Sequence, residues 1–238
     1  MHCPILQTKS FVQWGPSHGA ALIAIAILVP IVLLAGRALR GTRGEKLGSR
    51  LFAAAILAFD LPFQVYSMLP SNWDIRESLP LQLCDLAWMA GVHALWTGSP
   101  RSSALLYYWG LTLTSQALIT PHLQWDFPHL GFFMFWGSHS LVLLAAVYRT
   151  WGLGFRPGWR SFRFTAAVTA LWALVMLPLN AVLGTNYGYL NAKPAGRSVL
   201  DLLGPWPWYL VLEAAAVLAV WCLLTLPGAR FPRGEVKL

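Results

Sequence analysis

Two residues in apolar stretches of the sequence, Cys84 and His139, have side chains suited to acyl transfer. A thiol becomes an effective nucleophile when a base removes its proton, and a nearby histidine is the usual base. Transfer through a thioester also needs hydrogen-bond donors that stabilise the oxyanion of the tetrahedral intermediate. Candidate donors are the amides of Gln82, Gln116 and Asn180. The sequence therefore contains the parts of a catalytic site for acyl chemistry.

The same residues also have ordinary structural interpretations. An isolated cysteine in a membrane helix is commonly a small apolar filler, and an isolated histidine commonly forms a hydrogen bond between helices. Asp85 could orient the imidazole of His139. Asp60 and Glu213 could link helices or carry protons, and the sequence does not separate these two roles.

The composition places these residues in a membrane protein. The chain has 238 residues, of which 57% are hydrophobic and 11% are charged. Soluble domains average about 45–50% apolar and about 25% charged residues, so this chain cannot cover a soluble globule with solvated side chains. A soluble enzyme, a disordered chain and a coiled coil are therefore excluded. The three cysteines are widely separated and predict neither a disulfide framework nor a zinc site.

Seven apolar runs predict an all-α fold, a polytopic membrane bundle of seven transmembrane helices that forms one domain over residues 1–238. A spanning helix needs about 20 residues, and no run has the alternation of a barrel strand. Pro80 and Pro205 are predicted to open the third and seventh helices, because proline suits the first helical turn. The predicted spans are residues 17–36, 51–69, 79–97, 104–120, 131–148, 164–184 and 206–226.

Lysine and arginine are divided unevenly between the two sides of this bundle. The first, third and fifth connections and the tail hold 13 of them, whereas the other side holds Lys9, Arg76, Lys193 and Arg197. Loops with excess lysine and arginine stay in the cytoplasm. We therefore predict the N-terminus outside and the C-terminus in the cytoplasm. The short, separated basic segments do not predict a nucleic-acid partner, despite a net charge of +8.

Most of the polar residues in the apolar runs share one depth. At 1.5 Å per residue, polar side chains of six predicted helices lie roughly 6–12 Å below the outer helix ends. Scattered structural hydrogen bonds would not be expected to share a depth, so we predict one polar cavity in the outer half of the bundle. Its predicted lining is Asp60, Gln82, Cys84, Asp85, Gln116, His139, Asn180 and Glu213.

The predicted third helix carries polar residues on two faces. At 100° per residue, Gln82 and His93 lie close to one line and Cys84 lies about 160° away from it. One of these faces would contact lipid if the helix were peripheral, which is unfavourable for polar groups. We therefore predict a central third helix.

The loop after the sixth predicted helix is rich in amide and phenol groups and lies on the side of the predicted cavity. It could cap the cavity and present cations to a lipid phosphate, and a plain interfacial loop is the alternative. The spacing of His122, Asp126 and His129 fits no standard zinc pattern, so we expect no metal and no cofactor. The candidate head-group ligands are Asn186, Tyr187, Asn191, Lys193 and Arg197.

A set of short motifs, taken in order, gives the chain a resemblance to a known family. The motifs are LPLQLC at residues 79–84, SQALITP at 115–121, GSH at 137–139, NYGYL at 186–190 followed by Lys193-Pro194, and GPWPWY at 204–209. Over residues 60–211 the chain resembles the bacterial YwaF-type integral membrane proteins, which are similar to the eukaryotic transmembrane protein 164 acyltransferases. The resemblance implies a multi-helix bundle that moves fatty acyl chains between phospholipids, including ether lysophospholipids. It also implies a nucleophilic cysteine in the third helix, matched by Cys84, and a partner histidine, matched by His139.

The residues and the resemblance together predict a membrane acyltransferase or transacylase that uses a Cys84 thioester and His139 as base. Its predicted partners are a phospholipid or lysophospholipid substrate and the bilayer, with the oligomeric state left open. We expect a multi-pass protein, in the plasma membrane if the source is bacterial. One alternative is a seven-helix transporter or lipid-binding receptor that uses Asp60, Asp85 and Glu213. A second alternative is a membrane lipid hydrolase with the same two residues and water as acceptor.

Overall fold

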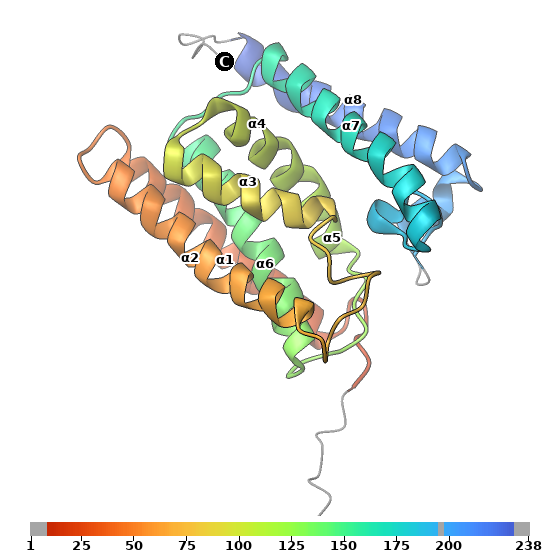
Figure 1. Cartoon of the computed structure of the whole chain (residues 1–238). Coiled ribbons are helices and arrows are strands. Elements are labelled where there is room, and N and C mark those ends of the chain that lie inside the picture. Colours follow the sequence, from red (N-terminus) through yellow and green to blue (C-terminus); the bar gives the residue numbers. More distant parts are fainter. Residues whose placement is uncertain (1–8, 195–197, 231–238) are drawn as a thin grey trace, which may run out of the picture.

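The fold is helical throughout the part of the chain that the structure describes. A computed structural model describes residues 9–194 and 198–230. Within these ranges the only extended pairing is an isolated antiparallel bridge between Ser10 and Trp125. The helices pack side by side, as Figure 1 shows. The predicted all-α fold is therefore confirmed.

The helices are joined by connections of different lengths, with long ones before α3 and before α8. The first three are α1 (Pro16–Leu39), α2 (Glu45–Met68) and α3 (Leu83–Thr97). A fourth run is made of α4 (Pro100–Tyr108), the π-helical η1 (Trp109–Leu113) and α5 (Thr114–Ile119). The remaining elements are α6 (Leu130–Val147), the π-helical η2 (Tyr148–Gly152), α7 (Trp159–Leu183), the short η3 (Tyr187–Tyr189) and η4 (Val199–Leu203), and α8 (Trp208–Arg230).

Each of the seven predicted ranges overlaps one of these helical runs, with shifted ends. The third helix begins at Leu83, so residues 79–82 lie outside it and Pro80 does not open the helix. The last helix begins at Trp208, which leaves Pro205 in the segment before it. The prediction that these two prolines open helices is therefore wrong. In both places the proline lies in a loop, and the helix begins after that loop ends.

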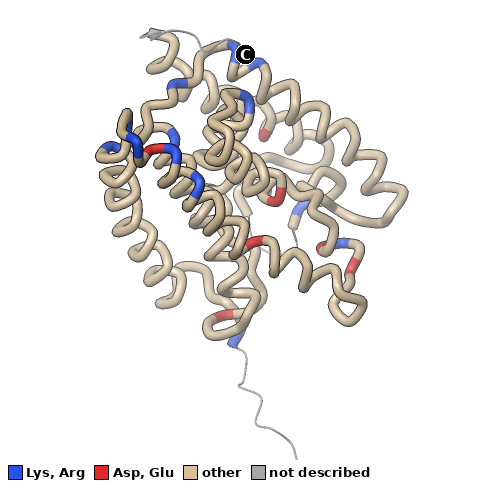
Figure 2. Tube along the Cα trace, turned by 60° about the vertical axis from the view of Figure 1, so that its left-hand side comes forward, with Lys and Arg blue, Asp and Glu red and all other residues tan. Residues whose placement is uncertain are grey.

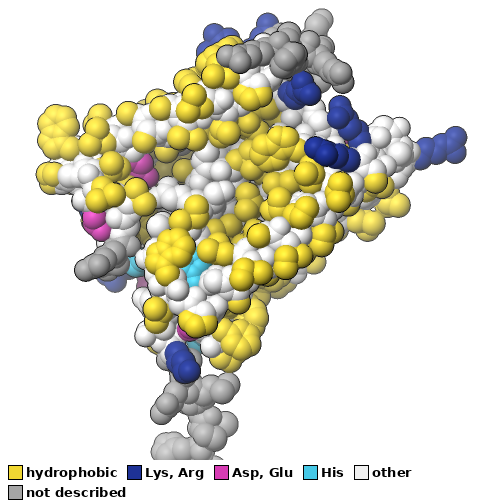
Figure 3. Space-filling model, turned by 180° about the vertical axis from the view of Figure 1, so that it is seen from behind, with side chains coloured by type: hydrophobic (Ala, Val, Ile, Leu, Met, Phe, Trp, Pro, Cys, Tyr) yellow, Lys and Arg dark blue, Asp and Glu magenta, His cyan; other side chains and the backbone are white. Residues whose placement is uncertain are grey.

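In the part of the chain that the structure describes, five helices are long and apolar enough to cross a membrane, namely α1, α2, α6 with η2, α7 and α8. Their outer faces expose large apolar side chains: Leu174 and Val182 of α7 are 68% and 82% exposed, and Leu223 of α8 is 66% exposed. Figure 3 shows hydrophobic side chains spread over much of one face of the molecule. Contiguous apolar surface of this extent is unfavourable in water and suits lipid. The protein is therefore a multi-pass membrane protein.

The third helix lies among other helices, as predicted, but His93 on one of its two polar faces is exposed. The helix packs against α2, α4 and α6, and its contact faces carry the small residues Ala87, Ala90, Gly91 and Ala94, all buried. Small side chains let helix backbones approach closely, which is how membrane helices gain packing energy without a hydrophobic driving force. The position of α3 inside the bundle places its polar N-terminus among other helices.

The pair α7 and α8 is joined to the rest of the bundle by hydrogen bonds from aromatic side chains. The Tyr108 hydroxyl lies 2.7 Å from the Thr225 hydroxyl of α8, and the Trp109 indole donates to Thr169 of α7 at 2.9 Å. Tyr108 and Trp109 are almost fully buried. A tyrosine or tryptophan in a core usually satisfies its polar atom, and here that requirement fixes where α7 and α8 lie.

Charge is concentrated at one end of the bundle. Figure 2 shows most lysine and arginine residues near the connection between α1 and α2 and near the end of α8, and few at the opposite end. The predicted orientation, with the C-terminus in the cytoplasm, depends on this uneven distribution of lysine and arginine.

The orientation can be checked with two loop positions. We expect a cysteine introduced by Asn72→Cys, in a chain with serine at the natural cysteines, to react with a membrane-impermeant maleimide in intact cells. A cysteine introduced by Thr42→Cys should react only after the cells are permeabilised, because Thr42 lies at the basic end. Both positions are exposed. The opposite labelling pattern would reverse the predicted orientation.

Candidate functional site

The candidate nucleophile lies in the first turn of α3. Asp85 accepts a hydrogen bond from the backbone N–H of Gln82 through Oδ2 at 3.0 Å, which satisfies one N–H at the start of the helix. Backbone N–H groups of Cys84 and Asp85 face the Cys84 sulfur. N–H groups at a helix N-terminus favour a negative charge. Burial and the neighbouring Asp85 carboxylate oppose such a charge on the sulfur, so the resting group is a thiol. Cys84 is half-buried and free.

A buried carboxylate lies near this turn. Asp60 of α2 is 6% exposed and contacts the Ser138 side chain of α6, while its Oδ2 has no hydrogen-bond partner within the described residues. Cys84 and Asp85 are each within electrostatic reach of Asp60. The structure therefore brings together three predicted cavity residues from two helices, together with Ser138.

Gly137 explains how α2 approaches α6 so closely at this point. A Cβ atom at Gly137 would lie only 2.1 Å from Cζ of Phe59, so any larger residue would displace the Phe59 ring. Phe59 in turn packs against Phe63 with ring centroids 4.9 Å apart. The Gly-Ser-His motif thus lets Phe59 lie on the α6 backbone and places Ser138 beside Asp60.

The same motif ends with the candidate base. Nδ1 of His139 lies 2.8 Å from the carbonyl oxygen of Phe135, and the two rings are stacked at 4.3 Å. A carbonyl oxygen only accepts, so Nδ1 carries the hydrogen of the neutral imidazole and Nε2 is left as the basic nitrogen. Nε2 is therefore the nitrogen that would take a proton, and burial of the ring opposes the charged imidazolium.

No hydrogen bond joins Cys84 to His139 among the interactions of the described residues, although α3 and α6 are in contact. The two residues lie on neighbouring helices. Their pairing during a reaction stays a prediction.

The segment after α7 is held by the side chain of Asn180, which is 1% exposed. Its Nδ2 donates to the carbonyl oxygen of Tyr187 at 3.0 Å and to Oδ1 of Asn191 at 2.9 Å. Its Oδ1 accepts from the Thr185 hydroxyl and from the Tyr187 N–H, each at 2.8 Å. One amide therefore folds residues 185–191 against the end of α7.

This folded segment also reaches the start of α3. The N–H of Gly188 donates to Oε1 of Gln82 at 2.8 Å, and the Tyr187 hydroxyl donates to the carbonyl oxygen of Ile75. Gly188 has φ +69° and a Cβ there would lie 2.1 Å from the Trp172 ring, so only glycine fits. Trp172 donates to the carbonyl oxygen of Leu81 at 2.9 Å. The segment thus covers the N-terminus of α3.

Tyr189 connects this cover to Cys84 and to α8. It is within electrostatic reach of Cys84, and its carbonyl oxygen accepts from the Tyr209 hydroxyl. Burial raises the pKa of Tyr187 and of Tyr189 above the ordinary tyrosine value. These two phenols therefore keep their protons at neutral pH and remain hydrogen-bond donors.

The other predicted residues of this region have identifiable places. Asn186 accepts through Oδ1 from two backbone N–H groups, and Lys193 lies 3.9 Å from Asp201 and over the Tyr209 ring. Gln116 is half-buried in α5, and Glu213 of α8 is half-buried near Tyr209. Arg197 lies outside the described residues.

A family model described as the TMEM164 family matches residues 13–225. The chain belongs to the TMEM164 family. An uncharacterised protein of Treponema pallidum (strain Nichols) is 26% identical over 234 residues, which covers 98% of this chain and 97% of the relative. No solved structure matches the chain.

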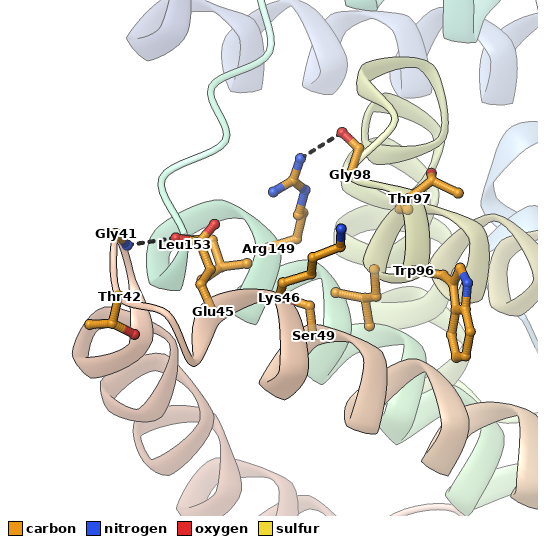
Figure 4. A pocket seen from close by; sticks show the side chains of 12 residues that line it. Gly41, Thr42, Glu45, Lys46, Ser49, Trp96, Thr97, Gly98, Arg149 and Leu153 are labelled. Atoms are coloured by element: carbon orange, nitrogen blue, oxygen red, sulfur yellow. Dashed lines mark hydrogen bonds between the residues drawn. The ribbon is translucent and has the colours of Figure 1, made fainter.

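Two cavities of this TMEM164 protein lie at its basic end. The first has a volume of about 360 Å³ and includes Lys46, Arg149 and Glu45 in its lining. Figure 4 shows the Arg149 guanidinium turned toward Gly98, whose carbonyl oxygen it contacts at 3.0 Å. The second cavity has a volume of about 670 Å³. Neither lining contains a residue that the sequence predicted for the site.

Sequence reasoning missed Ser138, Phe59 and Trp172. Ser138 stands next to the candidate base, and a hydroxyl inside an apolar run was an available signal. Phe59 and Trp172 were not separable from other apolar residues, because their importance comes from the glycines that they contact.

The hydrogen bonds of Asn180 predict a large effect on stability. We expect Asn180→Ala to lower the free energy of unfolding by about 2–4 kcal/mol, since two buried backbone groups of Tyr187 lose their partners. Denaturant or thermal unfolding of the detergent-solubilised protein measures this. Asn72→Ala is the control, because Asn72 is exposed and donates one hydrogen bond. Equal stability of the two variants would contradict the structural role of Asn180.

Proposed function

We propose that this TMEM164-family protein is a membrane acyltransferase or transacylase that moves fatty acyl chains between phospholipids through a thioester on Cys84. The observation that carries the proposal is the fixed tautomer of His139, which leaves Nε2 as a base on the helix next to Cys84. Asp60, Asp85 and Tyr189 lie near the thiol. The two carboxylates oppose a negative charge on the sulfur, so the proposal requires His139 to remove the proton during the reaction.

The proposed reaction has two halves. His139 Nε2 takes the proton of Cys84, and the thiolate attacks the ester carbonyl carbon of a donor phospholipid. The ester C–O bond breaks, the lysophospholipid leaves with the proton from His139, and the acyl chain stays as a thioester. In the second half, His139 takes a proton from the hydroxyl of an acceptor lysophospholipid, whose oxygen attacks the thioester carbonyl, and Cys84 leaves as a thiolate that regains a proton.

The supporting residues have proposed roles that fit their hydrogen bonds. Gln82 uses Oε1 to accept from Gly188, so its amide hydrogens remain available for an oxyanion. Asn180 holds the cover over the start of α3. Gln116 and Glu213 complete the proposed outer-half cavity. Lys193 and Arg197 remain the proposed cations for the lipid phosphate. Asn186, Tyr187 and Asn191 use their polar side-chain atoms in hydrogen bonds within the protein, so their proposed role is to hold this segment in place.

The proposal includes the arrangement in the membrane. Seven spans result if α3 and the run from α4 to α5 cross the bilayer together with the five long apolar helices. The N-terminus then lies outside and the C-terminus in the cytoplasm, and in a bacterium the membrane is the plasma membrane.

One observation favours a second candidate function. Asp60 has a buried carboxylate oxygen, Oδ2, without a hydrogen-bond partner in the described part of the chain. Such an oxygen inside a membrane protein could bind a proton or a cation, as in a transporter.

The thioester is tested with Cys84 and His139 variants in proteoliposomes. Transfer of a labelled acyl chain between phospholipids should fall about 10²–10⁴-fold in Cys84→Ala and in His139→Ala, and the double variant should be little worse than either. Wild-type protein mixed with donor lipid should carry a hydroxylamine-sensitive acyl adduct on Cys84 by intact-mass analysis.

Cys222→Ser is the matched control, because Cys222 is the other free cysteine in the described residues and lies near the basic end. Its activity should equal that of the wild type. Full transfer in Cys84→Ala would exclude the thioester. Release of free fatty acid without transfer would identify a hydrolase, and solute uptake that requires Asp60, without acyl transfer, would identify a transporter.

A further inference from the structure

The larger cavity at the basic end lies between four parts of the chain that are distant in sequence. It has a volume of about 670 Å³ and is lined by the end of α1, by Tyr107 of α4, by η2 and the segment after it, and by the end of α8. It lies away from Cys84 and His139, and the proposed acyl transfer makes no use of it.

Three arginines line this cavity, Arg37 and Arg40 from α1 and Arg156 from the segment after η2. No aspartate or glutamate is among its lining residues. Among the interactions of residues 9–194 and 198–230, none of these three side chains forms a hydrogen bond or an ion pair. Three guanidinium groups around one cavity, with no acidic residue among the described residues that line it, create a strong preference for an anion.

The position of one guanidinium is set by the backbone opposite to it. Gly154 has φ +83°, and a Cβ atom there would lie 2.4 Å from Cζ of Arg40. The Arg40 guanidinium therefore lies directly against a glycine whose conformation few other residues adopt. Because Gly154 has no side chain, the Arg40 guanidinium has room at this position.

The rest of the lining is largely apolar. It includes Trp151, Phe155, Leu223 and Leu224, of which Leu223 is 66% exposed on the outer face of α8. Figure 3 shows lysine and arginine side chains gathered at one end of a broad hydrophobic face. A ligand that matches this surface has an anionic group for the arginines and an apolar part for α8.

We propose that this cavity binds the phosphate of an anionic phospholipid at the basic end of the bundle. Guanidinium groups bind phosphate oxygens through paired N–H donors, which a choline-headed lipid satisfies less well because its own cation opposes them. The neighbouring cavity is less suited, because Glu45 is in its lining and Arg149 already donates to Ser103 and Gly98.

The test uses the full chain in a mild detergent with added lipid. Native mass spectrometry should detect bound phosphatidylglycerol at concentrations where phosphatidylcholine does not bind, and phosphatidylglycerol should raise the melting temperature more. The triple variant Arg37→Gln, Arg40→Gln, Arg156→Gln should bind phosphatidylglycerol at least about tenfold more weakly. Inorganic phosphate at millimolar concentration should not displace the lipid.

The control triple variant is Arg43→Gln, Arg101→Gln, Arg163→Gln. It removes the same charge from the same end of the bundle, and none of its positions lines the cavity. Wild-type affinity in this variant supports a specific site, whereas equal weakening of the two triple variants would overturn it. Displacement by inorganic phosphate would also overturn the lipid assignment. Because the readout is binding rather than turnover, failure here leaves the proposed acyl transfer standing, and the reverse also holds.

Discussion

The start of α3 imposes the main constraint on this structure, because a helix N-terminus with free N–H groups lies inside a bundle of apolar helices. Buried polar groups in lipid must find partners within the protein. Asp85 takes the N–H of Gln82, and the Gln82 side chain takes the N–H of Gly188. Covering this N-terminus requires the segment after α7 to fold inward, which Asn180 brings about. The thiol of Cys84 is left in the same polar turn.

The sequence was sufficient to predict the helices and the basic end, since these depend on apolar runs and on charge between them. The central place of α3 was also predictable, because its polar residues occupy two faces. The contacts around the site were not predictable in this way. Gln82 and Gly188 are 106 residues apart, and no periodicity of either helix indicates that they meet. Residue type alone identified the amides of Gln82 and Asn180 as candidate oxyanion donors. Only the tertiary structure shows the hydrogen-bond partners that these two amides have.

Two glycines, one in the Gly-Ser-His motif and one in the segment after α7, determine how the polar residues beside them are placed. Gly137 lets the Phe59 ring lie on α6 beside Ser138 and His139, and Gly188 lets Trp172 lie on the cover of α3. Each glycine permits an aromatic ring to pack against the backbone, which holds the adjacent polar residue in one place. A motif such as Gly-Ser-His is thus explained by packing and hydrogen bonding together, whether or not its histidine acts as a base.

The two ends of the bundle satisfy their polar groups in opposite ways. At the end that carries Cys84, the amides and phenols of residues 180–191 bind one another and the start of α3, so this end is folded before any lipid arrives. At the basic end, the arginines around the larger cavity have no acidic neighbour in its lining. Repulsion among them destabilises the isolated chain, and a phosphate between them removes that repulsion. The first end is therefore organised from within, whereas the second depends on the membrane for its counter-charge.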